Sequence, residues 1–193
     1  MRTGNLFVIS GPSGAGKGTL VARLVNEIDD LWLSISTTTR KPRGTERNGV
    51  EYNFVSDAEF DRLIACDGLL EWACVHGARY GTPRAHIEHQ MACAKQIILE
   101  IDVQGAFQVK EKMPEAHLVF IEPPSLDVLR MRLEKRATDA PEEIEKRLKT
   151  AKLELSQKMK YDIALVNDDL DETTLRLISY VNKKANENEV SGK

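Results

Sequence analysis

Glycines and one lysine gather in a short stretch directly behind an apolar run. The stretch GPSGAGKGT covers residues 11–19 and follows the run from Leu6 to Ile9, with only Ser10 between them. Backbone N–H groups of such a loop can approach an anion closely, and Lys17 adds a positive charge that suits β- and γ-phosphates. The spacing Gly-x-x-x-x-Gly-Lys between a strand and a helix is typical of nucleotide phosphate binding. The predicted phosphate-binding residues are Gly11, Pro12, Ser13, Gly14, Ala15, Gly16, Lys17, Gly18 and Thr19.

The residue after Lys17 departs from the usual form of this loop. A serine or threonine that binds magnesium normally follows the lysine, whereas Gly18 stands there and Thr19 comes next. Thr19 can still bind the metal, contact a phosphate or cap the helix, and we expect a Mg²⁺ ion held largely by water and nucleotide oxygens. The alternative for the whole loop is a strand-to-helix turn without a ligand.

A second group of side chains predicts another phosphate site. Arg40 and Arg43 flank Pro42, whose ring stiffens the turn, so two guanidinium groups can point at one phosphate. Tyr52 and Tyr80 can donate phenolic hydrogen bonds to the same phosphate. The alternative for the RKPR segment alone is a solvated loop, but a second phosphate-binding motif in the same chain favours binding.

Four apolar runs punctuate the chain and predict the strands that position these residues. The runs are continuous and contain many β-branched residues, as in parallel strands that are covered on both faces. They cover residues 6–9, 97–101, 118–121 and 163–166. Between them, apolar residues recur at helical spacing, namely Leu20, Leu24 and Ile28 in one segment and Ile144, Leu148, Ala151, Leu155 and Met159 in another. This alternation predicts an α/β fold with a parallel sheet flanked by helices.

Two regions interrupt the alternation and predict inserted parts. Residues 35–82 are rich in threonine, glycine, aromatic residues and turn formers, which indicates a small lobe with short strands of its own. Residues 126–147 are dense in arginine and are split by a turn around Thr138 to Pro141. This pattern predicts a helical hairpin that can act as a lid, with Pro141 in the first turn of its second helix.

Length and composition fit a single domain. The 193 residues can bury one core, and 41% hydrophobic with 30% charged residues is the balance of an ordinary globular protein. We expect a core made of residues 1–34, 83–125 and 148–193, with the lobe and the lid inserted, and a frayed end from residue 183. No apolar stretch approaches the roughly 20 residues that span a bilayer, so no membrane segment is expected.

Charge and cysteine content limit the expected partners and compartment. The formal net charge of −3 offers no general attraction to nucleic acid or to an anionic membrane. Cys66, Cys74 and Cys93 are odd in number and lack C-x-x-C spacing, which indicates neither a disulfide framework nor a structural zinc site. A reducing cytoplasm is the expected compartment.

Further motifs resemble those of the nucleoside monophosphate kinases, and of the guanylate kinases in particular. Adenylate kinases are similar in carrying GKGT. The segments STTTRKPRGTERNGVEYNFV, LLEWACVHGARYGT, EIDVQG and VNDDL look like guanylate kinase signatures in their order and spacing, and the similarity extends from Leu6 to about Val181. The resemblance implies a P-loop kinase core, an inserted lobe that binds a nucleoside monophosphate, and a helical lid. It also implies transfer of the γ-phosphoryl group of ATP to GMP or dGMP with Mg²⁺, in purine nucleotide metabolism.

Glu71 is the candidate reader of the base. A carboxylate only accepts hydrogen bonds, and guanine offers two adjacent donors, N1–H and the 2-amino group, whereas adenine presents a lone pair at N1. Ser36 and Thr82 stand where the resembling family has hydroxyls that contact the base. The alternative for Glu71, which lies beside Trp72, is an exposed helix carboxylate.

Asp102 and Glu100 form an acidic pair at the end of the run IILEID. Ligands of parallel sheets gather outside the carboxyl ends of the strands, so Asp102 is predicted to bind the acceptor nucleotide and to orient magnesium-bound water. Glu100 lies two residues earlier on the same face and is predicted to contact the acceptor nucleotide. The alternative is that the pair caps a helix.

Three lid arginines complete the predicted site. Arg132, Arg136 and Arg147 correspond to arginines that close over the donor triphosphate in the resembling family, so they join Lys17 and Arg40 as catalytic candidates. Their alternative is a charged surface paired with Glu134, Glu142, Glu143 and Glu145. The resemblance also implies that Asn167, in VNDD, lies near the adenine of ATP.

Two other functions compete with this hypothesis. Guanylate-kinase-like interaction modules typically lack the loop lysine or the arginine set, whereas Lys17 and the arginines named above are present. A kinase of the same fold could instead act on another phosphorylated acceptor, against which Glu71, Ser36 and Tyr80 argue. Small nucleotides are therefore the predicted partners.

Overall fold

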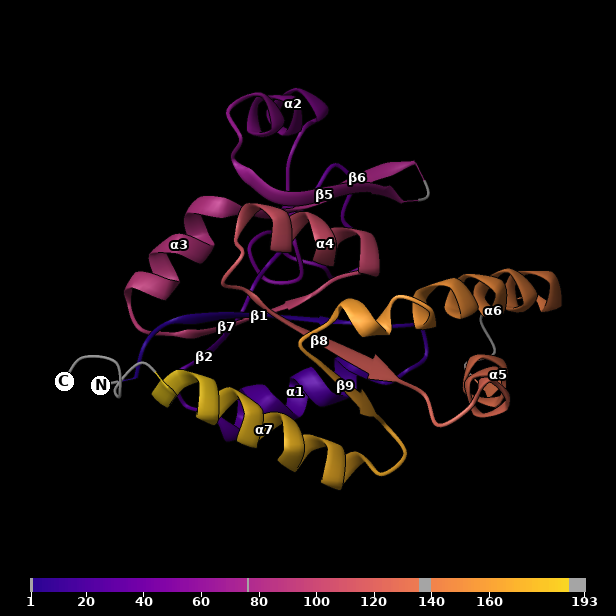
Figure 1. Cartoon of the computed structure of the whole chain (residues 1–193). Helices are drawn as coiled ribbons and strands as arrows, with labels where there is room; N and C mark the ends of the chain where they lie inside the picture. Colours follow the sequence, from indigo (N-terminus) through magenta and orange to yellow (C-terminus); the bar gives the residue numbers. More distant parts are fainter. Residues whose placement is uncertain (1, 76, 136–139, 188–193) are drawn as a thin grey trace.

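A parallel sheet of five strands forms the centre of the molecule (Figure 1). The structure is a computed structural model that describes residues 2–75, 77–135 and 140–187. In sheet order the strands are β2 (Leu31–Leu33), β7 (Gln96–Glu100), β1 (Asn5–Ser10), β8 (His117–Glu122) and β9 (Ile163–Val166). The four predicted strands are confirmed, whereas the short edge strand β2 is not predicted by the sequence pattern.

Two pairs of helices cover the two faces of this sheet (Figure 1). Helices α1 (Lys17–Glu27) and α7 (Leu170–Glu187) pack on one face, and α3 (Arg84–Ala92) and α4 (Val103–Lys112) pack on the other. Because both faces are buried, the central strands contain few polar residues, which is the pattern that parallel sheets require. The predicted α/β fold with a parallel sheet flanked by helices is confirmed.

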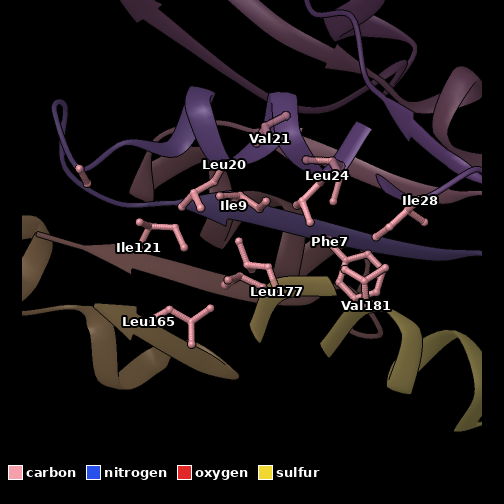
Figure 2. Close-up of a cluster of buried hydrophobic side chains, with 13 residues drawn as sticks. Phe7, Ile9, Leu20, Val21, Leu24, Ile28, Ile121, Leu165, Leu177 and Val181 are labelled. Carbon is pink, nitrogen blue, oxygen red and sulfur yellow. The ribbon is translucent and has the colours of Figure 1, made fainter. Parts of the chain in front are cut away.

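Alternate residues of the central strand build the core beneath α1 and α7 (Figure 2). Phe7 and Ile9 of β1 belong to one buried cluster with Leu20 and Leu24 of α1 and Leu177 of α7. The helical spacing in residues 20–28 therefore serves to cover the sheet. This packing fixes α1 directly behind β1, and so fixes both ends of the loop between them.

Two predictions about helix ends are wrong. Helix α6 (Pro141–Leu155) stops before Met159, which lies in the short 3₁₀ helix η1 (Lys158–Lys160) and is 87% exposed. The chain must turn there to enter β9, so the apolar spacing that reaches Met159 has no packing partner. The expected frayed end is wrong for residues 183–187, because α7 continues to Glu187: Ala185 is buried and its carbonyl accepts a hydrogen bond from the Thr3 N–H at 3.1 Å. Residues 188–193 of that expected end lie outside the described residues.

The inserted region after β2 has short strands of its own, as predicted. They are β3 (Thr37–Thr38), β4 (Asn53–Phe54), β5 (Leu69–Val75) and β6 (Ala78–Pro83), in the sheet order β4-β3-β6-β5. Helix α2 (Asp57–Ala65) lies in the same region and begins with a capping box made by Ser56 and Glu59. The Gln108 side chain of α4 both accepts from the Trp72 N–H and donates to the Trp72 carbonyl, which fastens β5 to the core.

The predicted helical hairpin lies beyond the carboxyl end of β8 (Figure 1). Helix α5 (Leu126–Lys135) packs on α6 through a buried cluster that includes Leu129, Leu133 and Ile144. Pro141 occupies the first turn of α6, as predicted. The expected boundary between lid and core after residue 147 falls inside α6, and the turn residues 136–139 lie outside the described residues.

The character of the helices and the exposure of the cysteines bear on two of the predictions. Within the described ranges, none of the helices combines the length and the apolar character needed to cross a membrane. Cys66, Cys74 and Cys93 are free thiols on the surface.

The core cluster can be tested on two neighbouring residues of α1. Leu24 is fully buried, whereas Val25 is 43% exposed. Leu24→Ala should lower the free energy of unfolding by about 3 kcal/mol, because it leaves a cavity in a close-packed cluster. The matched variant Val25→Ala should change the same quantity by less than about 0.5 kcal/mol. Urea denaturation followed by circular dichroism measures both, and equal losses would contradict the buried placement of Leu24.

Candidate functional site

Only glycine fits two positions of the loop that joins β1 to α1. Gly11 has a φ of 137°, and a Cβ atom there would lie 2.1 Å from the carbonyl oxygen of Ile121. Gly16 has a φ of 96°, and a Cβ atom there would lie 2.3 Å from Nδ2 of Asn167. The loop backbone therefore wraps closely against β8 and the end of β9, in a conformation that side chains would prevent.

Lys17 is the first residue of α1 and folds back over the loop. Its Nζ donates to the carbonyl oxygens of Gly11 at 2.7 Å and Pro12 at 3.1 Å. The positive end of α1 and the lysine charge therefore act at the same place. The N-cap of α1 is Gly16, without a side-chain hydrogen bond, so Thr19 does not cap the helix and that alternative is wrong.

A cavity of about 330 Å³ opens beside this loop. Asn167 is almost fully buried, and its Nδ2 donates to the carbonyl oxygen of Ala15 at 2.8 Å. Arg132 of α5 donates to the Asn167 carbonyl at 3.0 Å and to the Ala15 carbonyl at 3.4 Å. The structure thus brings together predicted residues from three separate segments. The cavity is lined by Gly14, Gly16, Thr19, Arg132, Lys135, Asn167, Asp168 and Leu170.

The lid arginines that the structure describes both reach the loop. Arg147 of α6 donates to the Ser13 hydroxyl at 3.4 Å, and Arg132 makes the contacts given above. The acidic neighbours have other partners, because Glu145 pairs with Arg130 and Glu143 with Lys146. The surface-pairing alternative is therefore not supported for these two glutamates. Arg136 lies outside the described residues.

At the second predicted phosphate site, aromatic rings gather around Arg40. The Arg40 guanidinium lies 5.3 Å from the ring centroid of Tyr52 and 5.8 Å from that of Phe54, and the rings of Tyr52 and Tyr80 are 5.8 Å apart. Glu46 accepts from both terminal nitrogens of Arg40, and this hydrogen-bonded pair raises the pKa of Arg40 and lowers that of Glu46.

Arg43 lies on the exposed turn of the same loop. Its backbone N–H donates to the Glu46 carboxylate at 2.7 Å. The sequence pattern does not single out Glu46, and the signal present is Gly44, a turn-forming residue two positions before it. The structure therefore brings Arg40, Tyr52 and Tyr80 together and adds Glu46 to them.

Glu71 is buried in strand β5. It is 6% exposed, and its Oε1 accepts from the Thr82 hydroxyl at 2.7 Å. The alternative of an exposed helix carboxylate is therefore wrong. Burial raises the pKa of Glu71 to about 7; the Thr82 hydrogen bond opposes this rise and the Asp102 charge adds to it. Ser36 lies between β2 and β3, where its carbonyl accepts from the Asn53 N–H at 2.8 Å.

Asp102 and Glu100 have different surroundings. Strand β7 ends at Glu100, and Asp102 is the N-cap of α4, where its Oδ1 accepts from the Gly105 N–H at 2.8 Å. The expectation that Asp102 ends the strand is therefore wrong, and the capping alternative is confirmed for it. The Glu100 carboxylate oxygens lie 3.6 Å from where a Cβ atom of residue 18 would stand, so Glu100 faces the first turn of α1, directly behind the loop.

The acidic pair connects the two predicted nucleotide sites. A Cβ atom at Gly105 would lie 2.8 Å from the Glu71 Oε2, so Glu71 lies against the first turn of the helix that Asp102 caps. Glu100, two residues before Asp102, lies beside Gly18 in the first turn of α1. The short segment from residue 100 to 105 therefore touches both sites.

Comparisons with known proteins agree with this geometry. A family model described as guanylate kinase matches residues 3–184. The guanylate kinase of Streptomyces kasugaensis is 48% identical over 97% of this chain and 91% of its own length, and that of Streptomyces coelicolor is 50% identical over 92% and 90%. A crystal structure of guanylate kinase from Anaplasma phagocytophilum matches with a TM-score of 0.74 at 33% identity, over 95% of this chain and 87% of that one. The chain belongs to the guanylate kinase family.

Proposed function

We propose that this chain transfers the γ-phosphoryl group of ATP to GMP, and also to dGMP, giving ADP and the nucleoside diphosphate. The observation that carries the proposal is the placement of the buried Glu71 against the segment 100–105, whose other end lies beside the glycine loop. An acceptor nucleotide that donates two hydrogen bonds to Glu71 would therefore lie beside the segment that also borders the proposed donor site. Family membership supports the same reaction.

The proposed donor site is the loop and its neighbours. Loop amides, Lys17 and Thr19 would hold the ATP phosphates, and Asn167 and the cavity beside it would receive the nucleoside. Arg132, Arg136 and Arg147 would supply positive charge to oxygens that become more negative during transfer. The contacts of Arg132 and Arg147 with the loop support this assignment.

The proposed acceptor site reads the phosphate and the base with different groups. Arg40, Arg43, Tyr52 and Tyr80 would bind the phosphate of GMP by charge and phenolic hydrogen bonds. The base would be held by Glu71 together with Ser36 and Thr82, and Glu100 and Asp102 would contact the acceptor nucleotide. A buried carboxylate rejects adenine because it would face the lone pair of N1 without a donor.

In this reaction the protein side chains need only position the two nucleotides and stabilise the transition state. The attacking oxygen of GMP is already an anion at neutral pH, so no side chain has to remove its proton. Alignment of the two phosphates and positive charge on the transferred group supply the catalysis. Closure of the lobe 35–82 and the lid 126–147 would exclude water, which otherwise would accept the phosphoryl group.

The residues at the loop fit a magnesium ion that is held mainly by nucleotide and water. Gly18 offers no hydroxyl, and among the described residues no three His, Cys, Asp or Glu side chains lie together as a metal cage. Asp102 is exposed at the start of α4 and would orient metal-bound water, and Thr19 lines the cavity beside the loop. When bound, Mg²⁺ neutralises charge on the donor phosphates.

A coupled assay of ADP release tests the proposal against its competitors. GMP, dGMP, AMP, UMP and a sugar phosphate would be compared as acceptors, with and without Mg²⁺. Turnover with the guanine nucleotides alone is expected. Phosphorylation of another acceptor would assign a different kinase activity, and binding of a peptide without any turnover would assign an interaction module. The proposed location is the cytoplasm.

Loss of the loop charge should abolish most of the activity. Lys17→Ala should lower kcat by roughly 10³-fold, because it removes a positive group from the donor phosphates. Lys183→Ala is the matched control, since Lys183 is an exposed lysine on α7 that pairs with Glu187. Steady-state kinetics with saturating GMP measure both variants. A Lys17→Ala enzyme with unchanged kcat would remove the loop from the mechanism.

Neutralising the buried carboxylate should erode base selection. Glu71→Gln should lower kcat/KM for GMP by about 10²-fold, because a hydrogen bond to a charged acceptor is lost and an amide N–H₂ faces the guanine donors. The kcat/KM for AMP should change little, so the ratio of kcat/KM for GMP to kcat/KM for AMP reports the selectivity. Glu88→Gln makes the same charge change on an exposed residue of α3 and should leave the ratio unchanged. Equal losses for GMP and AMP would show that Glu71 does not read the base.

The affinity for GMP should depend on pH through Glu71. The pKa of Glu71 is raised to about 7, so its carboxyl is protonated below neutrality and offers a donor where guanine needs an acceptor. The dissociation constant of GMP should therefore rise by up to about tenfold per pH unit as the pH falls below 7. Calorimetric titrations over a range of pH measure the GMP affinity of the unaltered chain and of Glu71→Gln. The ionisation of the GMP phosphate, with a pKa of about 6, affects both proteins equally, so the difference between the two profiles reports Glu71. Parallel pH profiles would contradict the assignment.

A further inference from the structure

We propose that Glu46 is a positioning residue that orients Arg40 toward the phosphate of the acceptor nucleotide. The inference rests on the proposed function, and it adds a residue that takes no part in the assignments above. Its basis is a set of contacts that joins the side chain of Arg40, the backbone of Arg43 and two aromatic rings.

Both carboxylate oxygens of Glu46 accept hydrogen bonds from one edge of the Arg40 guanidinium. Oε2 accepts from Nη1 and Oε1 accepts from Nη2, each at 2.9 Å. The two side chains are largely shielded, with exposed fractions of 12% for Arg40 and 24% for Glu46. A planar fork held at two points cannot rotate in its own plane, so this pair fixes the direction of the remaining N–H groups.

Glu46 is itself held by the backbone of its turn. The Glu46 N–H donates to the Arg43 carbonyl at 3.0 Å, and the Arg43 N–H donates back to the Glu46 carboxylate at 2.7 Å. The carboxylate therefore links the two arginines that are proposed to bind one phosphate. Moving Glu46 away from Arg40 would also break the hydrogen bond to the backbone of Arg43.

Aromatic rings and a carbonyl complete the support of the guanidinium. The rings of Tyr52 and Phe54 lie against it, and Nη1 also donates to the Lys41 carbonyl at 2.8 Å. Glu46 and Lys41 together use three of the guanidinium N–H donors. Few donors remain for a phosphate, so their direction matters, and Glu46 sets it.

The other interpretation is that Glu46 fills the phosphate site and must be displaced by GMP. A carboxylate that GMP displaces from Arg40 would be expected to have few other hydrogen bonds. Here it accepts three hydrogen bonds, one of them from a backbone N–H of its own turn, and Arg40 lowers its pKa so that it stays ionised at neutral pH. These contacts favour a permanent support over a temporary occupant.

The test is the substitution Glu46→Gln, with Glu51→Gln as its matched control. Glu51 lies in the same loop, is exposed, and accepts from the Arg47 N–H at 2.7 Å. Both variants lose one negative charge and keep the side-chain shape, but only Glu46→Gln turns an amide N–H₂ toward the Arg40 donors. Glu46→Gln should raise the dissociation constant and the KM of GMP by about tenfold, and Glu51→Gln by less than about twofold.

Isothermal titration with GMP and steady-state kinetics give the two readouts. The KM of ATP should stay within about twofold in both variants, since the donor site is separate, and this also shows that the variants are folded. If Glu46→Gln does not fold, Glu46→Asp replaces it, because the shorter side chain keeps the charge and cannot reach all three donors. Glu46→Asp should also raise the dissociation constant of GMP.

Three outcomes overturn the inference. Unchanged GMP affinity in Glu46→Gln would make the pair structural only, and tighter binding would make Glu46 a competitor of the phosphate. An equal rise of KM for GMP and ATP would point to a general loss of structure. Failure of the proposed function is seen separately, as absence of GMP binding and turnover in the unaltered chain.

Discussion

The parallel pairing of β1 with β7 is the constraint on which the rest of the site depends. Its register sets Ile9 opposite Glu100, so the two strands end side by side at the same edge of the sheet. The glycine loop leaves β1 there, and the cap of α4 begins two residues after β7 ends. A shift of this register would separate Lys17 from Glu100 and Asp102 together. The buried apolar faces of both strands prevent such a shift.

A second constraint is the burial of an acidic group that the fold alone does not require. Glu71 loses hydration in β5, and the Thr82 hydroxyl compensates for only part of the loss, which leaves its pKa raised to about 7. A guanine with two donors would supply the missing hydrogen bonds. The buried carboxylate therefore has unmet hydrogen bonds until its proposed ligand binds. A guanine would satisfy them and an adenine would not, which is the basis for discrimination between the two bases.

The sequence predicts those parts of the molecule in which the residue pattern follows from the environment. The central strands are predictable because both of their faces are covered, whereas Leu31–Leu33 is too short and too exposed to leave such a pattern. Met159 continues the spacing of α6 by chance, and only the turn into β9 decides that the helix has already ended. Glu46 is not predictable from spacing alone, because its role depends on where the turn places its carboxylate relative to Arg40.

The α5–α6 hairpin contacts the loop at a glycine as well as through two arginines. A Cβ atom at Gly14 would lie 2.9 Å from Cδ1 of Leu129 and 3.2 Å from Cδ2 of Leu133, so α5 packs directly on the loop backbone. Arg132 of the same helix donates to the Ala15 carbonyl. A change in the loop backbone at Gly14 would therefore alter the packing of α5 on it. Because the two are packed together, a nucleotide that fills the loop and the lid that covers it would respond to each other without a separate signal.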